Sequence, residues 1–227
     1  MELKGGFDMR FKTPSAFVLG GVSQSGKTTF TLNMLRYIDQ LFDKPERKQN
    51  IIFYYHQWQS LYENFRQENI VKHWINKLPT EDDVKERTLL YKDKGGSIIV
   101  IDDFAQELNK GVATIFSELV HHTNSVVILL TQNIFSKNIY FRDISLNSTY
   151  VILFKNPRDS LQIVNFARQF SPGKNPYIVQ AYKEATKSAY SYLLFDLHQS
   201  TRDDLRVRSN VLPGAHLCIY KKKGESS

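Results

Sequence analysis

The chain has 227 residues, of which 41% are hydrophobic and 13% are aromatic. These values are typical of a folded globular protein, and the length favours one α/β domain with a substantial core over two full domains. The net charge of +7 allows a polyanionic partner without identifying one. The single cysteine excludes both an intramolecular disulfide and a cysteine-rich zinc site.

No segment has the composition of a membrane span or of a secretion signal. The apolar runs are all shorter than the roughly 18 residues that a bilayer-spanning helix needs. Residues 1–13 mix charges with glycines, whereas a signal peptide has an apolar centre. The sequence therefore predicts a soluble intracellular protein with no membrane partner.

Short apolar runs alternate with helical segments through the first 130 residues. The predicted strands are 15–19, 51–55, 97–101 and 125–130, and the clearest predicted helices are 28–42 and 112–122. In the first helix, Phe30, Met34, Ile38 and Phe42 recur on one face. The alternation predicts a parallel sheet built from right-handed crossovers. The continuous apolar character of the strands predicts that helices cover both faces of the sheet.

A complete phosphate-binding motif, G-x-x-x-x-G-K-[ST], follows the first predicted strand and opens the first predicted helix. The predicted nucleotide contacts are Gly21, Val22, Ser23, Gln24, Ser25, Gly26, Lys27, Thr28 and Thr29. Glycines let the backbone amides approach phosphates, and the helix N-terminus favours an anion. We therefore predict that the loop binds ATP with Mg²⁺, that Lys27 reaches the β- and γ-phosphates, and that the Thr28 hydroxyl coordinates the metal.

Two adjacent carboxylates, Asp102 and Asp103, end the third predicted strand. A carboxylate at this position is expected to hold Mg²⁺ through a water, which is the role we assign to Asp102. Asp103 is then placed to polarise the attacking water as a general base. In the alternative, Asp103 only caps the following turn and Glu107 serves as the base.

The fourth predicted strand ends in Thr131, Gln132 and Asn133. We expect Gln132 to bind the attacking water or a phosphate oxygen, and Asn133 is a weaker candidate for the same role. Because a further strand separates the phosphate loop from the carboxylates, we interpret the topology as the ATPase type with an inserted central strand. Such a topology favours hydrolysis over phosphoryl transfer to a small metabolite.

The pattern changes beyond residue 131. Strands are predicted at 150–155 and 190–197, helices at 161–170 and 177–187, and weak strands near 205–207 and 216–219. The predicted fold is an α/β P-loop NTPase of the ASCE/RecA-like type, with a mostly parallel sheet flanked by helices and a small C-terminal extension. We divide the chain into an N-terminal arm (1–13), an ATPase core (14–170), an extension that completes or flanks the sheet (171–220), and a basic tail (221–227).

Several motifs together resemble those of one family. GVSQSGKT, IIVIDDF and the stretch HHTNS running into VVILLTQN are similar to the genome-packaging ATPases of the HerA/FtsK group. The likeness is closest to the poxvirus-like enzymes of eukaryotic double-stranded DNA viruses and of Polinton/Maverick and adintovirus elements. Residues 142–147 and 154–159 look similar as well, so that the resemblance covers roughly residues 17–169.

The resemblance implies a homo-oligomeric ring that threads double-stranded DNA, without sequence preference, into a preformed capsid through a vertex or portal component. It implies that the protein acts in the host-cell nucleus or where virus particles assemble, or that it is associated with the virion. An arginine from the neighbouring subunit would complete each active site, with Arg142 as the first choice and Arg158 as the second; Arg168 is a third candidate. The segment 54–59 would lie near the adenine or the ring pore.

Two other functions are compatible with these motifs. The first is a cellular DNA translocase or helicase of the same superfamily. The second is a P-loop nucleotide switch or kinase with no role on DNA. A motor predicts hydrolysis that duplex DNA stimulates, whereas a switch predicts slow hydrolysis that is indifferent to DNA. Candidate DNA contacts are Lys85, Arg87, Lys92, Lys94 and the lysines of the tail.

Overall fold

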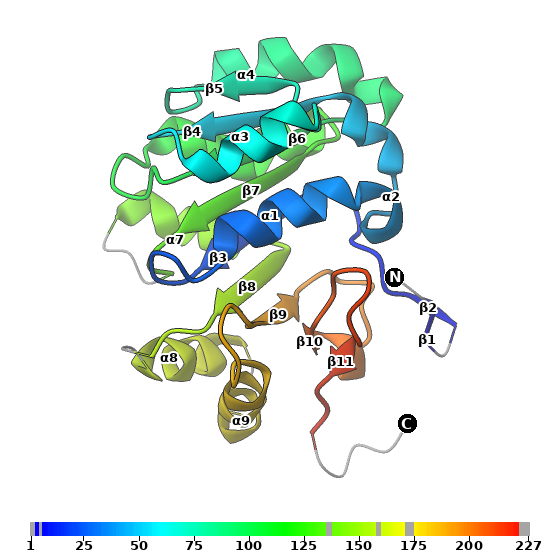
Figure 1. Cartoon of the computed structure of the whole chain (residues 1–227), viewed down its shortest axis with the longest axis vertical. Coiled ribbons are helices and arrows are strands. Elements are labelled where there is room, and N and C mark those ends of the chain that lie inside the picture. The colour runs from blue at the N-terminus through cyan, green and yellow to red at the C-terminus, as the bar shows by residue number, and fades with distance from the viewer. Residues whose placement is uncertain (1–2, 5, 135–137, 158–159, 171–174, 223–227) are drawn as a thin grey trace.

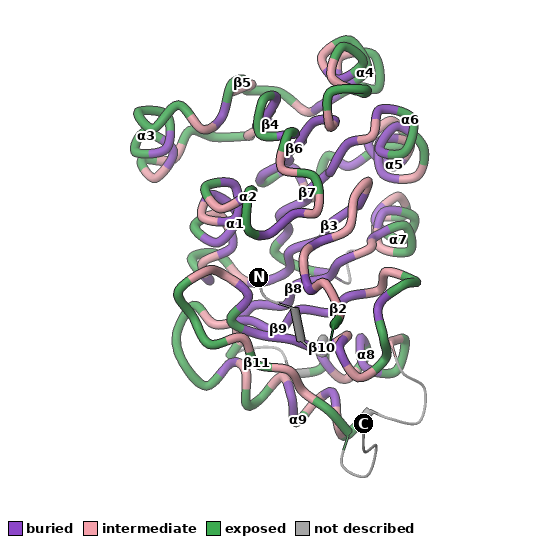
Figure 2. Tube along the Cα trace, turned by 90° about the vertical axis from the view of Figure 1, so that its right-hand side faces the viewer, coloured by how far each residue is buried: buried purple, intermediate pink, exposed green. Residues whose placement is uncertain are grey.

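A computed structural model describes residues 3–4, 6–134, 138–157, 160–170 and 175–222 of the chain. A twisted central sheet lies between two layers of helices, as Figures 1 and 2 show from two directions. The α/β class with a mostly parallel, helix-flanked sheet is confirmed. None of the helices in the described ranges is long and apolar enough to cross a lipid bilayer.

The main sheet has the strand order β5-β4-β6-β7-β3-β8-β9-β10-β11. The six strands from β5 to β8 in this order are mutually parallel, and β9, β10 and β11 are added antiparallel. Their bounds are β3 Ser15–Gly20, β4 Ile51–Tyr55, β5 His73–Ile75, β6 Ile98–Asp102, β7 Val126–Thr131, β8 Tyr150–Phe154, β9 Tyr192–Asp196, β10 Val207–Ser209 and β11 Cys218–Ile219. A separate two-stranded hairpin joins β1 (Leu3–Lys4) to β2 (Phe7–Asp8).

Strand β7 lies between β3, which leads into the phosphate-binding motif, and β6, which carries the two carboxylates. The predicted insertion of a central strand is therefore confirmed. Because β3, β6 and β7 are parallel, their carboxyl ends meet at one edge of the sheet, where the polar residues that follow each strand come together.

The two faces of the sheet bury separate hydrophobic clusters. On β3, Ala16 and Val18 belong to one cluster, and Phe17 and Leu19 belong to the other, as the two-residue period of a strand requires. The second cluster packs under α1 (Lys27–Arg36), α2 (Ile38–Leu41) and α3 (Ser60–Gln67). Figure 2 shows these three helices on one side of the sheet and α4 to α8 on the other.

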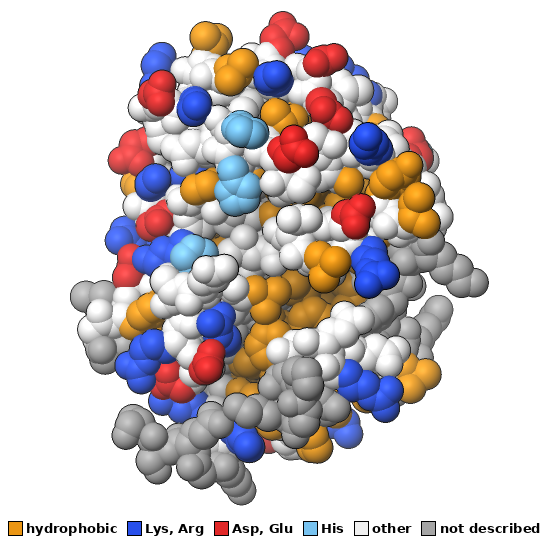
Figure 3. All heavy atoms as spheres, turned by 180° about the vertical axis from the view of Figure 1, so that it is seen from behind, with side chains coloured by type: hydrophobic (Ala, Val, Ile, Leu, Met, Phe, Trp, Pro, Cys, Tyr) orange, Lys and Arg blue, Asp and Glu red, His pale blue; other side chains and the backbone are white. Residues whose placement is uncertain are grey.

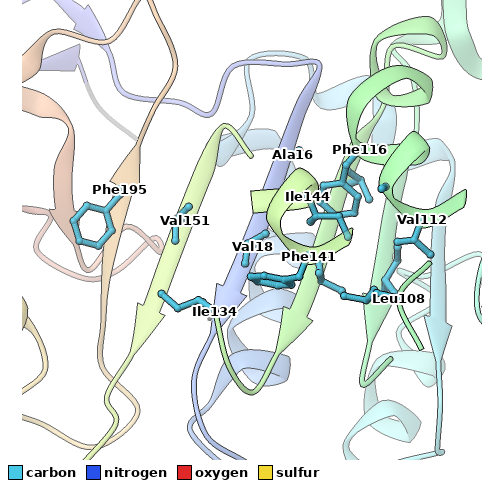
Figure 4. Packing of buried hydrophobic residues seen from close by; sticks show 14 of the residues in the cluster. Ala16, Val18, Leu108, Val112, Phe116, Ile134, Phe141, Ile144, Val151 and Phe195 are labelled. Carbon is cyan, nitrogen blue, oxygen red and sulfur yellow. The ribbon is translucent and has the colours of Figure 1, made fainter. Parts of the chain in front are cut away.

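The first cluster packs under the opposite layer, and Figure 4 shows Phe141 and Ile144 of α7 above Ala16 and Val18 of β3. The helices of this layer are α4 (Glu81–Thr88), α5 (Lys110–Thr114), α6 (Val120–His122), α7 (Ile139–Leu146), α8 (Ser160–Phe170) and α9 (Asn175–Ala185). One π-helical turn, Ile115–Leu119, joins α5 to α6, so the predicted helix 112–122 is confirmed with an altered middle turn. Within the described ranges, 3₁₀ segments lie at Pro45–Gln49, Leu89–Lys94 and Asp203–Leu205.

Two predicted elements are wrong in detail. The predicted helix 28–42 is broken at Tyr37, whose backbone (φ −107°, ψ 29°) ends α1, and Phe42 is already extended. The four-residue spacing of apolar side chains continues across the break because all four of them still face the sheet. The weak strand predicted at 205–207 is instead a 3₁₀ turn followed by β10 at Val207–Ser209.

Candidate nucleotide-binding and hydrolysis site

The phosphate-binding motif forms a loop between β3 and α1. Gly26 precedes α1 with φ 99°, and Gln24 also adopts the left-handed conformation, with φ 61°. A side chain on Gly21 would place its Cβ 2.7 Å from both Phe154 Cβ and Ser25 Oγ. The first glycine is therefore required by close packing and the second by its backbone conformation.

Lys27 is only 9% exposed and points back into the loop. Its ammonium group donates hydrogen bonds to the carbonyl oxygens of Gly21 (2.5 Å) and Val22 (3.0 Å). Burial lowers the pKa of Lys27, and the nearby carboxylates Asp102 and Asp103 act in the opposite direction. A phosphate would supply the negative charge that this buried ammonium group otherwise receives only from carboxylates and carbonyl dipoles.

The Ser25 hydroxyl of the same loop is buried and has no hydrogen-bond partner among the described residues. A buried hydroxyl without a partner is costly, and a phosphate oxygen would satisfy it. The loop thus fits a nucleotide phosphate on two counts, the orientation of Lys27 and the unsatisfied Ser25 oxygen.

Asp102 ends β6 and is 4% exposed. Its Oδ2 accepts hydrogen bonds from the Thr28 hydroxyl at 3.1 Å and from the Tyr62 hydroxyl of α3 at 2.8 Å. Burial raises the pKa of Asp102, while these two hydrogen bonds act to lower it. Asp103 is exposed, and its backbone is left-handed with φ 67°, which turns the chain out of the strand.

Thr28 and Asp102 bring a hydroxyl and a carboxylate together at the rim of the loop, and this pair fits Mg²⁺. Mg²⁺ prefers oxygen ligands and usually keeps several waters, so it needs few side chains when a nucleotide supplies phosphate oxygens. When bound there, the metal would neutralise charge that develops on the phosphates.

All predicted catalytic and metal-binding residues except the arginine line one cavity of about 200 Å³ at the carboxyl edge of the sheet. Lys27, Thr28, Asp102, Asp103 and Gln132 all contribute to it. Its remaining walls come from Ser23, Gln24, Gln59, Leu130 and Thr131. Residues that are far apart in the sequence therefore meet in the arrangement that the motifs predict, although their roles remain predictions.

A second cavity of about 530 Å³ adjoins the first and shares Gln24, Lys27, Thr28 and Gln59 with it. Thr29 lines this cavity, and so do six residues that the sequence does not predict to belong to the site: Phe30, Asn33, Leu61, Tyr190, Tyr192 and Leu212. An aromatic, partly apolar cavity next to a phosphate loop has the character of a nucleoside site. No local motif marks these residues, because they come from α1, α3, β9 and the loops beside β9 and β10, which are distant in the sequence.

Other candidates do not join the site in this chain. Arg142 is exposed on α7 and lines neither cavity, and Arg168 is exposed on α8. Arg158 lies outside the described residues. Glu107, the alternative base, also lines neither cavity, and its carboxylate lies 3.1 Å from His56 Nε2.

Comparison with known proteins identifies the fold. No protein-family model and no curated protein matches this sequence. Among solved structures, the genome-packaging NTPase B204 of Sulfolobus turreted icosahedral virus 2, bound to sulfate, matches with a TM-score of 0.55 and 17% identity over 92% of this chain and 97% of that chain. The DNA-packaging ATPase B204 of Sulfolobus turreted icosahedral virus matches with a TM-score of 0.52 and 16% identity over the same shares.

A third match, the complex of the first protein with ATP-γS, has a TM-score of 0.50 and 16% identity over 92% of this chain and 97% of that chain. Similarity at this level of identity defines an architecture. Together with the strand order and the phosphate loop described above, it shows that this chain has an α/β P-loop NTPase fold.

Proposed function

We propose that this chain is a Mg²⁺-dependent ATPase that drives double-stranded DNA into a viral or virus-derived capsid as a subunit of a homo-oligomeric ring. The observation that carries the ATPase part is the convergence of Lys27, Thr28, Asp102, Asp103 and Gln132 on one cavity. These groups come from the ends of three parallel strands, and each has the chemistry that phosphoryl transfer to water needs.

The proposed role of each group follows from its position. Lys27 exchanges its loop carbonyl partners for phosphate oxygens, and Thr28 with Asp102 holds the metal. Asp103, exposed at the cavity rim, accepts a proton from the attacking water, which Gln132 orients from the end of β7. The adjoining cavity with Tyr190 and Leu212 receives the nucleoside.

The DNA-packaging part of the proposal rests on three supports. The first is the resemblance of the sequence motifs to packaging ATPases. The second is the fold, which is similar to that of structures named as viral genome-packaging NTPases. The third, which is the weakest, is the net charge of +7, which is compatible with a polyanionic partner. Contacts to DNA phosphates would make binding independent of sequence and sensitive to salt.

Two substitutions test the chemistry. Lys27→Ala is expected to abolish ATP binding and hydrolysis, because the loop loses its only side-chain ammonium group. Asp103→Asn is expected to keep ATP binding but to reduce hydrolysis by roughly 10²–10⁴-fold, the usual contribution of a general base. Phosphate release is measured with and without duplex DNA, and ATP binding is measured by calorimetry.

Lys183→Ala and Asp93→Asn serve as matched controls, since both residues are exposed and line neither cavity. Wild-type hydrolysis that duplex DNA does not stimulate would contradict the motor and favour a switch. Full activity in Asp103→Asn would instead remove Asp103 from the mechanism and leave the ATPase proposal standing.

A further inference from the structure

Tyr62 connects helix α3 directly to the proposed metal carboxylate. Its side chain is fully buried, and its hydroxyl donates a 2.8 Å hydrogen bond to Asp102 Oδ2. Thr28 donates to the same oxygen at 3.1 Å. The two donors come from α1 and α3, so one carboxylate oxygen is held from two helices at once.

The ring of Tyr62 is itself fixed by aromatic neighbours. Its centroid lies 5.1 Å from that of Phe53 on β4, 5.3 Å from that of Trp74 on β5, and 5.5 Å from that of Trp58. These contacts leave the ring little freedom to rotate, so the hydroxyl position is set by packing and not by the carboxylate alone.

Helix α3 is also attached to the helix of the phosphate loop. Arg36 near the end of α1 donates to Glu68 at 2.9 Å, just beyond α3, and its guanidinium lies 4.6 Å from the centroid of the Phe65 ring. The relative position of α1 and α3 therefore fixes the geometry in which Thr28 and Tyr62 meet Asp102.

We propose that Tyr62 is a positioning residue that sets the orientation of the Asp102 carboxylate toward Mg²⁺. This inference rests on the proposed function, because it concerns the metal of the same site. A buried carboxylate can rotate and exchange its two oxygens. The Tyr62 hydroxyl occupies one side of Oδ2 and so selects one orientation, with Oδ2 facing Thr28. Outer hydrogen bonds of this kind hold metal-binding groups in place, and their loss typically costs 10–100-fold in metal affinity or activity.

The test is Tyr62→Phe, which removes the hydroxyl and keeps the ring contacts with Phe53, Trp58 and Trp74. We expect the Mg²⁺ concentration for half-maximal ATP hydrolysis to rise by about 10-fold or more, with ATP binding in the absence of Mg²⁺ unchanged. Mg²⁺ is titrated in hydrolysis assays, and ATP binding is measured by calorimetry with and without MgCl₂.

The matched control is Tyr54→Phe. Tyr54 is also fully buried, and its hydroxyl donates to a carboxylate, Asp83 of α4, at 2.6 Å. Although Tyr54 begins the segment expected near the adenine or the pore, it belongs to the cluster on the opposite face of the sheet and lines neither cavity. Both variants lose a buried hydroxyl, so both melting temperatures are expected to fall, whereas only Tyr62→Phe changes the Mg²⁺ requirement. An unchanged requirement in Tyr62→Phe, or an equal change in both variants, overturns the inference. A wild-type protein that binds no ATP with or without Mg²⁺ overturns the proposed function instead.

Discussion

Tyr190 is the residue whose conformation most needs a functional explanation. Its side chain is 70% exposed, and its backbone is left-handed with φ 59°. An aromatic residue rarely adopts this conformation, which costs of order 1–3 kcal/mol. Its Cβ lies 3.2 Å from where a side chain on Gly26 would begin, so it stands directly against the phosphate loop and lines the larger cavity. These features suit a platform on which a nucleobase stacks.

Tyr190→Ala is therefore expected to weaken ATP binding by roughly 5- to 150-fold, because stacking on an aromatic side chain contributes about 1–3 kcal/mol per base. Binding of inorganic tripolyphosphate, which has no base, is expected to stay the same. Calorimetry with both ligands measures the difference. Tyr190→Phe keeps the ring and should bind ATP like the wild type, and equal losses for both ligands in Tyr190→Ala would exclude stacking.

The sequence predicts some residues of this site and not others, for a physical reason. Lys27 and Thr28 belong to a motif that follows β3, Asp102 ends β6, and Gln132 follows β7. Parallel strands bring their carboxyl ends together, so the local pattern is sufficient. Tyr62 reaches the site from within a helix, and Tyr190 reaches it from the approach to an antiparallel strand. Neither position carries a local signal, because only tertiary packing decides where these side chains point.

At the level of elements, strands β9 and β10 carry a buried ion pair in the extension. The side chains of Arg208 on β10 and Asp196 on β9 are 1% and 3% exposed and form a hydrogen-bonded ion pair. Arg208 also donates to the carbonyl oxygen of Met9 at 3.0 Å, which ties the N-terminal arm to these strands. Burial raises the pKa of Asp196 and lowers that of Arg208. The positive charge of Arg208 acts to lower the pKa of Asp196, and the negative charge of Asp196 acts to raise that of Arg208.

Arg208→Met is expected to destabilise the fold by about 3–5 kcal/mol, because it leaves the Asp196 carboxylate buried and unpaired. Urea unfolding measures this loss. Without Arg208 the folded protein binds a proton at Asp196 more tightly than the unfolded chain does. The difference in unfolding free energy between the variant and the wild type should therefore shrink as the pH falls. The double variant Arg208→Met/Asp196→Asn should recover much of the stability. A single variant as stable as the wild type would show that the pair contributes little.

The elements that were predicted correctly are those with long or fully apolar patterns, such as β4, β6 and β7. Strand β5 has only the three residues His73–Ile75 and pairs on one side with β4 alone, so its pattern is too short to recognise. The apolar pattern does not reveal the break at Tyr37, because Ile38 and Leu41, which follow it, remain buried. Periodicity reports which side chains face the core and does not report whether the backbone between them stays helical.

At the scale of the whole molecule, the exposed surface of α7 has the composition of an interface. Ile139 and Leu146 are 74% and 75% exposed, and they share one side of the helix with Arg142 and Asp143. Figure 3 shows the face to which α7 belongs, where hydrophobic side chains gather in the middle and charged ones surround them. An exposed apolar surface around an arginine is suited to contact with the next subunit of the proposed ring.

If Arg142 completes the site of a neighbouring subunit, Arg142→Ala should bind ATP normally but hydrolyse it about 10³-fold or more slowly, the usual effect of removing such an arginine. Mixing Arg142→Ala with Lys27→Ala should restore hydrolysis, because some interfaces then pair an intact Lys27 with an intact Arg142. Phosphate release from mixtures of varied ratio measures this rescue. Lys183→Ala, at an exposed position of α9 that lines neither cavity, is the control, and mixed rings that form but stay inactive would exclude Arg142.

The central position of β3 has a consequence for the order in which the domain forms. Both hydrogen-bonded neighbours of β3, the strands β7 and β8, lie in the second half of the chain. During synthesis β3 leaves the ribosome early and must wait for partners that are distant in the sequence, and such non-local pairing is slow. The phosphate-binding loop is thus made before the two strands that flank β3, and it gains its surroundings only after them. Nucleotide can therefore stabilise the finished domain, but it cannot guide the early stages of folding.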